Sequence, residues 1–550
     1  MPKKNTTRYI FVIGGVMSGI GKGISSSSVG LLLSSRGYRV NLMKIDPYLN
    51  VDAGTMNPLE HGELFILDSG LECDQDMGNY ERFTNKNYTN DDYLTSGMLY
   101  KSVIEKERAF GYKGRCVEAI PHLVDEAYQR IVRSATKSKA DIQIVEIGGT
   151  IGDYQNQIYL EAAKSFQVNY PDEVAFILVT YSPMPSILGD IKTRPTQRAI
   201  RDLNTFGIRP DVVIARSEKD LDKKHKEKIA RSSNIDVDIV ISAPNLESIY
   251  EVPLSLREEG VDDLLIDTLG LERKRQNKEI NRWKKFVSSQ KGRKKSVKIA
   301  VIGKYLGSTE KFTDAYISVG DALKSSGVAV GVKVEIDWFN SKYLERANHN
   351  SVIKQISSYD GILVPGGFGN SGVKGKLKII KHARENKIPY FGICYGMQIA
   401  AIEFARNVLG IRNATSEELN EKARDKVIHA MKEQKSNIKN KNYGGTMRLG
   451  AYKMHVKDKT LLRKLYKKQY VSERHRHRYE FNNAYIKRFE NKGLIMSAYS
   501  PDKSTVEAFS LDQNIHPFFV GTQYHPEFLA RPINPHPLFV GFIRAAASKK

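Results

Sequence analysis

Short, almost wholly apolar runs recur along the first half of the chain and constrain its fold more than any other feature. They include YIFVI (9–13), IQIVEIGG (142–149), EVAFILVTY (173–181) and DVVIARS (211–217). Amphipathic stretches separate these runs, a pattern typical of parallel strands joined by crossover helices. We therefore predict an α/β fold with a doubly wound parallel sheet, whose ligands bind at the carboxyl ends of the strands.

The second half repeats the α/β pattern. Its apolar runs are VKIAVIGKY (297–305), GILVPGGFG (361–369), IPYFGICYGMQIAAIEFA (388–405) and PFFVGTQYHPEF (517–528). A polar, lysine-rich stretch at 411–443 interrupts them, and we expect a partly helical surface excursion there.

Between the halves the composition changes. Residues 271–298 carry twelve Lys or Arg against two Glu, which is typical of an exposed helix and linker. A chain of 550 residues is also too long for a single hydrophobic core. We predict a first domain at 1–270, a basic interdomain linker at 271–296 and a second domain at 297–550.

The net charge of the chain is +23. This excess suits polyanionic ligands such as nucleoside triphosphates, although scattered solvated lysines also account for it. The basic clusters lack the interleaved aromatic residues of a single-strand binding platform, so we expect no nucleic acid partner. No segment approaches the ~18 apolar residues of a membrane span, and the start MPKKNTTRY has no apolar signal core. We expect a cytoplasmic protein without a membrane partner.

The glycine-rich segment GGVMSGIGKGISSSS (14–28) lies between an apolar run and a helical pattern. Strand, glycine turn and helix are the parts of a phosphate-binding loop. The segment departs from the usual spacing twice. Val16 stands where a glycine is expected, and Gly23 replaces the magnesium-binding Ser or Thr after Lys22. A phosphate site is predicted here, with the metal ligands supplied from elsewhere.

A candidate nucleophile, Cys394, lies in GICYG between a strand pattern and a helical pattern. Small flanking residues allow the sharp turn that exposes a nucleophile, and a helix N-terminus favours a thiolate. The segment YHPEF offers His525 as a base and Glu527 to orient it. Backbone amides of PGGFG (365–369) and of the residue after Cys394 are candidates for an oxyanion hole. Taken alone, Cys394 reads as a buried structural thiol and His525 as an ordinary histidine.

Together, these three motifs resemble the triad-type glutamine amidotransferases, which hydrolyse glutamine to glutamate and ammonia through a glutaminyl thioester. The segment ERHRHRYEFNN (473–483) is a further match. The resemblance implies Cys394 as the nucleophile, with His525 and Glu527 as its partners. It also implies a glutamine-binding set: Gly367, Tyr395, Gly396, Met397, Gln398, Glu418 and Arg478.

Ammonia in water at neutral pH is mostly ammonium, so a glutaminase has to feed a second site on the same protein. Four polar segments in the first half are candidates for that site: 44–70, 72–83, 146–153 and 190–197. Singly, such loops are usually only solvated surface. Together they supply cations for phosphates and carboxylates for magnesium, as phosphoryl transfer requires.

Nearly the whole chain resembles the CTP synthase family. The most specific stretches are GGVMSGIGKGI, MKIDPYLNVDAGTM, HGELF, DMGNYERF, VEIGGTIGD, KTRPTQ, PGGFG, GGTMRLGA and ERHRHRYE. The resemblance implies a P-loop-type amidoligase domain followed by a glutamine amidotransferase domain. In the implied reaction, ATP phosphorylates O4 of UTP, ammonia attacks C4, and phosphate leaves to give CTP.

The resemblance alone implies the residues of the first site. For ATP they are Gly19, Ile20, Gly21, Lys22, Gly23, Ile24, Lys44, Asp76, Arg216, Asn245 and Leu246. For UTP or CTP they are Ser18, Asp153, Tyr154, Gln155, Lys192, Thr193, Arg194, Pro195, Thr196, Gln197 and Lys228. The implied ammonia gate is His61, and the implied magnesium ligands are Asp76 and Glu146.

The resemblance also implies cofactors and partners. Mg²⁺ accompanies ATP, and no organic prosthetic group is expected. GTP is expected as an allosteric activator, CTP as a feedback inhibitor and a homotetramer as the assembly, while filament formation stays open. Two departures concern regulation: Gln155 replaces a glutamate of the family, which predicts altered CTP feedback, and Ser371 replaces an arginine in the GTP-responsive lid, which puts GTP activation in doubt.

Two alternatives stay open. One is another ATP-dependent amidoligase with a fused glutaminase, of the cobyric acid synthase type, which would not require KTRPTQ or KIDPYLNVD. The other is a basic scaffold or RNA-binding protein with an inactive amidotransferase fold, against which the intact set of Cys394, His525 and Glu527 argues.

Overall fold

The computed structural model describes residues 7–186, 189–274, 277–305, 314–346 and 349–548. The chain divides into two compact units, and each is described by itself. Unit 1 comprises Met1–Asp52 and Asn79–Val287, and unit 2 comprises Ala53–Gly78 and Ser288–Lys550. These units group residues by contact rather than by chain order, so the predicted domain boundaries stay a prediction.

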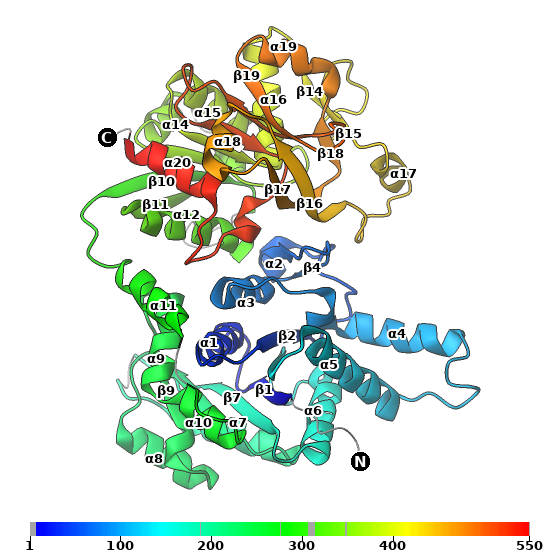
Figure 1. Ribbon diagram of the computed structural model, residues 1–550, viewed down its shortest axis with the longest axis vertical. Coiled ribbons are helices and arrows are strands. Elements are labelled where there is room, and N and C mark those ends of the chain that lie inside the picture. The colour runs from blue at the N-terminus through cyan, green and yellow to red at the C-terminus, as the bar shows by residue number, and fades with distance from the viewer. Residues whose placement is uncertain (1–6, 187–188, 275–276, 306–313, 347–348, 549–550) are drawn as a thin grey trace. The chain divides into compact units, whose positions relative to one another are not determined.

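Unit 1 is built on a seven-stranded sheet in the order β5-β2-β6-β1-β7-β8-β9 (Figure 1). All neighbouring strands run parallel. The strands are β1 (Arg8–Gly14), β2 (Val40–Asp46), β5 (Tyr93–Thr95), β6 (Ile142–Ile147), β7 (Val174–Tyr181), β8 (Val212–Ser217) and β9 (Val240–Pro244). The predicted doubly wound parallel sheet is confirmed.

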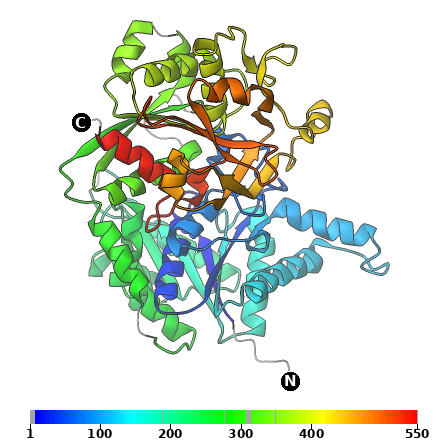
Figure 2. The same cartoon turned by 45° about the horizontal axis from the view of Figure 1, so that its top comes forward.

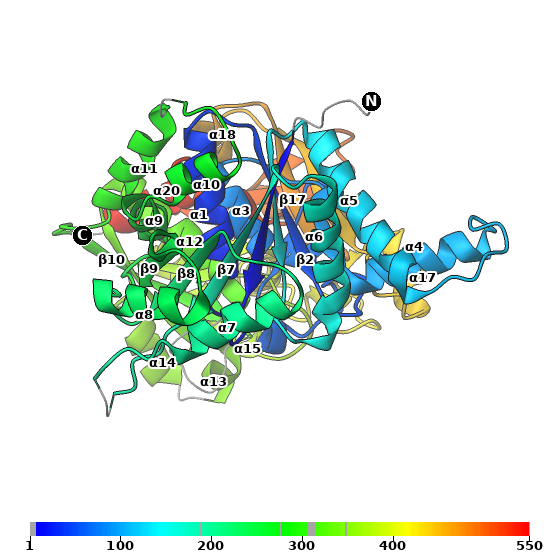
Figure 3. The same ribbon diagram turned by 90° about the horizontal axis from the view of Figure 1, so that it is seen from below.

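Helices cover both faces of this sheet, as Figure 3 shows. Alternate side chains such as Tyr9, Phe11 and Ile13 enter one core with residues of α4 to α8, whereas α1 packs with α9 and α10. The helices are α1 (Lys22–Ser35), α4 (Ser96–Arg108), α5 (Val124–Ser138), α6 (Gln157–Asn169), α7 (Arg194–Thr205), α8 (Lys223–Ser233), α9 (Val252–Glu258) and α10 (Val261–Thr268). The carboxyl edge of the sheet remains the place where loops can gather polar residues.

Unit 2 contains a nine-stranded mixed sheet in the order β11-β10-β12-β13-β21-β20-β19-β16-β17. The first five strands are parallel and the remaining pairings are antiparallel. The strands are β10 (Ser296–Gly303), β11 (Lys333–Asn340), β12 (Gly361–Val364), β13 (Tyr390–Ile393), β16 (Arg448–Val456), β17 (Tyr470–His477), β19 (Leu494–Tyr499), β20 (Val506–Leu511) and β21 (Phe519–Thr522).

Two apolar cores lie in unit 2. In one of them the C-terminal helix α20, red in Figure 2, packs with α12 and α18. The helices are α2 (Pro58–His61), α12 (Ile317–Val330), α13 (Ser341–Arg346), α14 (His349–Ile356), α15 (Val373–Glu385), α16 (Tyr395–Asn407), α17 (Gln434–Lys439), α18 (Leu461–Tyr466), α19 (Ile486–Glu490) and α20 (Pro537–Ser548).

The lysine-rich stretch at 411–443 is more regular than its composition predicts. It contributes β14 (Thr415–Ser416) and β15 (Lys426–Ala430) to a three-stranded sheet with β18 (Tyr479–Phe481). Val427 and Ile428 are fully buried. The helical part is confirmed by α17, but the strands were not expected because the apolar positions are few among the polar residues.

Residues 53–78 belong to unit 2 although they lie early in the sequence. They contain α2 and a hairpin of β3 (Leu64–Ile66) and β4 (Glu72–Asp74). The carboxylate of Glu63 accepts hydrogen bonds from the backbone and hydroxyl of Ser318. Asp68 pairs with the fully buried Arg474 at 2.6 Å. These contacts bind the segment firmly to unit 2.

The predicted exposed helix after residue 271 has a buried face. It is α11 (Lys278–Ser288), and Trp283 on it is fully buried against Phe83 and Tyr250 of unit 1. Its lysines alternate with apolar residues at helical spacing, so the expectation of full exposure was wrong for this face. Among the described residues, no helix is both long and apolar enough to cross a bilayer.

Candidate active sites

Cys394 lies in unit 2 at the sharp turn between β13 and α16. Its backbone has φ +49° and ψ −100°, a conformation that L-residues rarely adopt. Its amide donates to Thr522 O on the neighbouring strand β21 at 2.6 Å, and the residue is 3% exposed. Two glycines make the turn possible, because a Cβ on Gly396 would lie 2.1 Å from Val364 O. The geometry is that of a nucleophile elbow.

His525 and Glu527 follow β21. Their side chains form a buried pair, with His525 Nδ1 and Glu527 Oε1 2.7 Å apart. The imidazole stacks on Phe528 at a centroid distance of 5.2 Å. The backbone amide of His525 donates to Arg474 O on β17. This fixes the ring in the orientation that a base beside Cys394 requires.

Electrostatics support the same assignment. Burial alone lowers the pKa of His525, but the charges of Glu527 and Cys394 outweigh it and raise the pKa to about 10. The raised pKa keeps the imidazole protonated at neutral pH, and an imidazolium is the partner that activates the cysteine in a Cys–His couple.

The predicted oxyanion loop follows β12. A Cβ on Gly366 would lie 2.8 Å from His525 Cε1, so only glycine fits beside the imidazole. One residue further on, Gly367 is buried next to Tyr395. The peptide groups of Gly369 are held by Glu418, which accepts at 2.6 Å, and by the Tyr395 hydroxyl, which donates at 2.6 Å. The loop is therefore fixed near the nucleophile.

The predicted glutamine-binding residues divide into two groups. Tyr395, Gly396, Met397 and Gln398 form the buried first turn of α16 directly after the nucleophile. Arg478, by contrast, directs its guanidinium at three other polar groups: Gln434 Oε1, Thr446 Oγ1 and Tyr443 O. The structure thus brings most of the set to Cys394 and gives Arg478 other partners.

Sequence reasoning missed Gln523, which precedes the YHPEF motif by one residue. Its side chain is fully buried, and its Nε2 lies 3.6 Å from Cys394 Sγ. The only signal was its position next to the motif. A buried amide next to a nucleophile is not distinguishable by spacing from a structural glutamine.

The phosphate loop of unit 1 joins β1 to α1. Gly19 and Gly21 have φ +74° and +90°, and Val16, at the position where the usual pattern has glycine, also has φ +79°. Lys22 begins the helix, and its Nζ donates to Gly149 O at 2.6 Å. The unusual sequence thus adopts the backbone of a glycine-rich loop.

A buried charge cluster lies on β2 and β6, near the carboxyl ends of the two strands. Lys44 Nζ lies 2.8 Å from Glu146 Oε1 and 3.7 Å from Asp46 Oδ1. The hydroxyl of Tyr80 donates to the other oxygen of Glu146, and that of Tyr93 donates to Asp46 at 2.9 Å. Glu146 is 1% exposed. Its carboxylate suits magnesium chemically, although no cluster of three metal-binding side chains occurs in the part of the chain that is described.

The other predicted magnesium ligand, Asp76, falls in unit 2 at the start of α3 (Asp76–Thr84). Its amide donates to Asp74 Oδ1 at 2.9 Å. His61, the predicted ammonia gate, also lies in unit 2, where its Nε2 is 3.3 Å from Asp74 Oδ2. The roles of these residues remain predictions.

The predicted pyrimidine-nucleotide residues come from several elements of unit 1. Gln197 Nε2 donates to Thr193 Oγ1 and to Lys228 O, which joins two of the predicted segments. Lys192 pairs with Asp190 at 3.0 Å, and Asp153 accepts from the amide and hydroxyl of Thr150. Arg194 and Pro195 begin α7, whereas Tyr154 and Gln155 lie on an exposed turn after Gly152.

On the ATP side, Arg216 at the end of β8 donates to Asn245 Oδ1 at 2.9 Å. Its Nη1 lies 3.4 Å from where a Cβ on Gly21 would be, so it borders the phosphate loop. Burial lowers the pKa of Arg216. The half-buried Leu246 follows Asn245. The structure therefore brings the predicted adenine-side residues to the loop.

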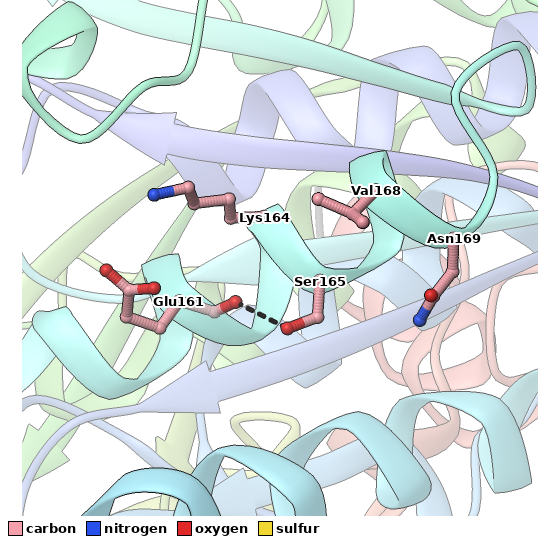
Figure 4. A pocket seen from close by; sticks show the side chains of 5 residues that line it. All are labelled: Glu161, Lys164, Ser165, Val168 and Asn169. Atoms are coloured by element: carbon pink, nitrogen blue, oxygen red, sulfur yellow. Dashed lines mark hydrogen bonds between the residues drawn. The ribbon is translucent and has the colours of Figure 1, made fainter.

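Figure 4 shows a pocket along a single helix, α6. Its lining residues are Glu161, Lys164, Ser165, Val168 and Asn169. None of them is a predicted site residue, and all come from consecutive turns of one surface helix. Such a hollow lacks the convergence of several elements that builds an active site.

Comparison with known proteins identifies the family of each half of the chain. Residues 8–271 match the family model for the CTP synthase N-terminus, and residues 311–545 match that for class-I glutamine amidotransferase. A CTP synthase of Thermococcus gammatolerans is 46% identical over 99% of this chain and 99% of its own. One of Carboxydothermus hydrogenoformans is 46% identical over 98% of both chains.

One solved structure is also similar, the glutaminase domain of Trypanosoma brucei CTPS with bound acivicin. It is 39% identical, covers 46% of this chain and 95% of its own, and has a TM-score of 0.42. The full-length relatives decide the assignment, because they cover both halves at high identity. The chain belongs to the CTP synthase family.

Proposed function

We propose that this CTP synthase with its glutamine amidotransferase domain makes CTP from UTP, ATP and L-glutamine, with the two half-reactions at the two sites described. The observation that carries the proposal is the buried pair of His525 and Glu527, 2.7 Å apart, beside a cysteine held in a strained turn. Such strain persists only where the surrounding structure enforces it, and it is typical of catalytic sites.

In unit 2, the thiolate of Cys394 attacks the carboxamide carbon of glutamine. The oxyanion that forms accepts hydrogen bonds from the backbone amides of Gly367 and Tyr395. The imidazolium of His525 protonates the leaving nitrogen, and ammonia departs as the C–N bond breaks. His525 then activates water, which hydrolyses the glutamyl thioester and releases glutamate.

In unit 1, O4 of UTP attacks the γ-phosphorus of ATP, and ADP leaves. Ammonia then attacks C4, and the bond from C4 to the phosphorylated oxygen breaks with release of phosphate. The amide groups of the loop from Gly19 to Ile24 hold the ATP phosphates, and Lys22 and Lys44 stabilise the charge that develops on the transferring group. Ammonia passes from Cys394 chemistry to this site, with His61 as the gate.

Magnesium fits this chemistry because hard carboxylate oxygens are its preferred ligands. Glu146, buried beside Lys44, and Asp76 are the residues that would hold it. When bound, Mg²⁺ neutralises phosphate charge during phosphoryl transfer.

The nucleotide partners and regulators follow the same assignment. Residues 192–197, Lys228 and the turn from Asp153 to Gln155 bind UTP or, as a feedback inhibitor, CTP. GTP activates glutamine hydrolysis, although Ser371 predicts weaker activation. A homotetramer is the proposed assembly, and neither nucleic acid nor membrane is a proposed partner.

A spectrophotometric assay of UTP conversion to CTP, run with glutamine or with ammonium salt, tests the proposal. CTP formation that requires ATP and accepts either nitrogen source is expected. An amidoligase of the cobyric acid synthase type would consume ATP without converting UTP, and a scaffold protein would do neither. A GTP titration in the same assay measures how far GTP raises the rate with glutamine, and a weak increase is expected.

A further inference from the structure

We propose that Gln523 is a positioning residue of the glutaminase site, whose side-chain amide donates a hydrogen bond to Cys394 Sγ and so stabilises the thiolate. The inference rests on the proposed role of Cys394 as the nucleophile. Gln523 belongs neither to the predicted catalytic motif nor to the predicted oxyanion hole.

The direction of this hydrogen bond follows from a chain of buried amides. Gln398 Nε2 donates to the backbone carbonyl of Tyr479 at 3.1 Å and to Gln523 Oε1 at 3.2 Å. A carbonyl oxygen can only accept, so the NH₂ group of Gln398 has to face it. The oxygen of Gln523 must then face Gln398, which leaves the NH₂ group of Gln523 directed at Cys394 Sγ, 3.6 Å away.

The sulfur has a partner for each protonation state. As a thiol, Cys394 donates to Arg476 O on β17 at 3.7 Å. As a thiolate it can only accept, and the amide of Gln523 is then a donor to it, beside the imidazolium of His525. When the proton moves from Sγ to His525 Nε2, the sulfur therefore exchanges the carbonyl partner for the amide partner without movement of the backbone.

Burial makes this uncharged donor important. Gln523 is fully buried, and Gln398 and Cys394 are each 3% exposed. A charged acceptor in such surroundings gains more from a donor than one in water. The backbone also fixes Gln523, because its amide donates to Glu507 O at 2.8 Å immediately after β21 ends.

Gln523 meets the predicted glutamine-binding set through the side chain of Gln398. The NH₂ group of Gln398 is occupied by Tyr479 and Gln523, so the two glutamines form a fixed pair. Removal of the Gln523 donor should therefore affect the ionisation of the sulfur and the turnover rate, and leave the affinity for glutamine largely unchanged.

The test uses the full-length chain and two variants. Gln523→Leu removes the donor, and Gln523→Glu keeps the shape of the side chain but replaces the donor with an acceptor. Gln469→Leu, the same change at an exposed position of unit 2, is the matched control. The rate at which iodoacetamide alkylates Cys394 is measured against pH by peptide mass spectrometry, beside kcat and KM for glutamine hydrolysis and the rate of ammonia-dependent CTP formation.

We expect the pH of half-maximal alkylation to rise by about one unit in Gln523→Leu and by more in Gln523→Glu. The kcat of glutamine hydrolysis falls about 10- to 100-fold with little change in KM. Ammonia-dependent CTP formation and the control stay at the unsubstituted level. If Gln523→Leu misfolds and loses ammonia-dependent activity, the same measurements on Gln523→Glu, which keeps the side-chain shape, test the proposal.

An unchanged alkylation profile in a folded Gln523 variant overturns the proposal, and so does a rise in KM at constant kcat. The assignment of the nucleophile is tested separately on the unsubstituted chain. If full alkylation of Cys394 leaves glutamine hydrolysis intact there, the nucleophile is wrong, whatever the Gln523 variants show.

Discussion

The two candidate sites are built on similar parallel strands but by different means. In unit 1, charged side chains on two neighbouring strands and at the start of a helix make the contacts: Lys44 on β2 contacts Glu146 on β6, and Lys22 of α1 contacts Gly149 O. In unit 2, two adjacent strands place a strained cysteine and a buried histidine–glutamate pair. The first site depends on contacts between charged groups, and the second on a strained backbone turn and a fixed side-chain pair. Different substitutions should therefore disable them.

The largest expected effect is the loss of charge in unit 1. Lys22→Ala should lower CTP formation roughly 10³-fold with either glutamine or ammonia, because the lysine stabilises the transferring phosphoryl group in both reactions. Basal glutamine hydrolysis should persist. The control is Lys223→Ala, whose side chain is 89% exposed on α8. Ammonia-dependent synthesis at the unsubstituted rate in Lys22→Ala would show that this loop does not bind ATP.

A change of geometry in unit 2 should have the next largest effect. Glu527→Gln should slow glutamine hydrolysis roughly 10²- to 10⁴-fold, because the imidazole loses its orienting carboxylate. Ammonia-dependent CTP formation should be unchanged. Equal losses with both nitrogen sources would mean that Glu527 supports the fold rather than the catalyst.

The same substitution should alter the pH dependence of stability. Because folding raises the pKa of His525 to about 10, its protonation stabilises the fold fully below pH ~6.5, and this contribution is lost as the pH rises through about 10. Glu527→Gln should reduce the loss of stability over that window, measured by urea unfolding at several pH values. An identical pH dependence in both proteins would contradict the paired state.

A buried lysine beside the second site offers a stability test. Lys376 is 1% exposed with its Nζ 4.8 Å from the Tyr395 ring centroid. Burial, with the charge of Lys304, lowers its pKa to about 7 against the opposing effect of Glu345 and Glu418. The unfolded chain therefore binds more protons between pH 7 and ~10.5, and stability should rise with pH over that window.

Lys376→Met should therefore stabilise unit 2 by about 1–4 kcal/mol at pH 7, and by less as the pH approaches 10. Hydrogen exchange of unit 2 peptides, followed by mass spectrometry in increasing urea, measures the change. A methionine variant that is less stable at pH 7 would show that the lysine has a partner worth more than its burial penalty.

The smallest expected effect concerns strain in the phosphate loop. Val16 has φ +79°, which costs an L-residue about 1–2 kcal/mol, whereas glycine loses about 0.5–1 kcal/mol in backbone freedom. Val16→Gly should therefore stabilise unit 1 by roughly 0.5–1 kcal/mol. Val168→Gly, in helical backbone at the exposed end of α6, should destabilise by a similar amount. Destabilisation by both would mean that Val16 is not strained.

The strand runs and both motif sets could be predicted from local sequence. β1, β6, β7 and β8 coincide with the apolar runs, since strands buried on both faces leave a continuous hydrophobic signal. The turn at Cys394 was predictable because a sharp strand-to-helix turn requires small residues directly beside the nucleophile. The residue types suggested His525 as the base for Cys394, and the resemblance supported the pairing, since strand order does not follow chain order.

Other features depended on contacts between distant residues. The grouping of residues 53–78 with unit 2 rests on pairs such as Asp68 with Arg474 and Glu72 with Arg476. In the sequence these carboxylates read as solvated loop charges. Gln523 was missed for a related reason, because its function depends on a hydrogen-bond chain that begins at Tyr479. Neither feature produces a periodic pattern or a motif spacing in the sequence.

The most direct test of two separate sites is the rate of CTP formation by Cys394→Ala with each nitrogen source. The account predicts that glutamine-dependent synthesis is abolished while ammonia-dependent synthesis stays within about twofold of the unsubstituted chain, because the cysteine belongs only to the site of unit 2. Persistence of both activities, or loss of both in a protein shown to be folded, would contradict it.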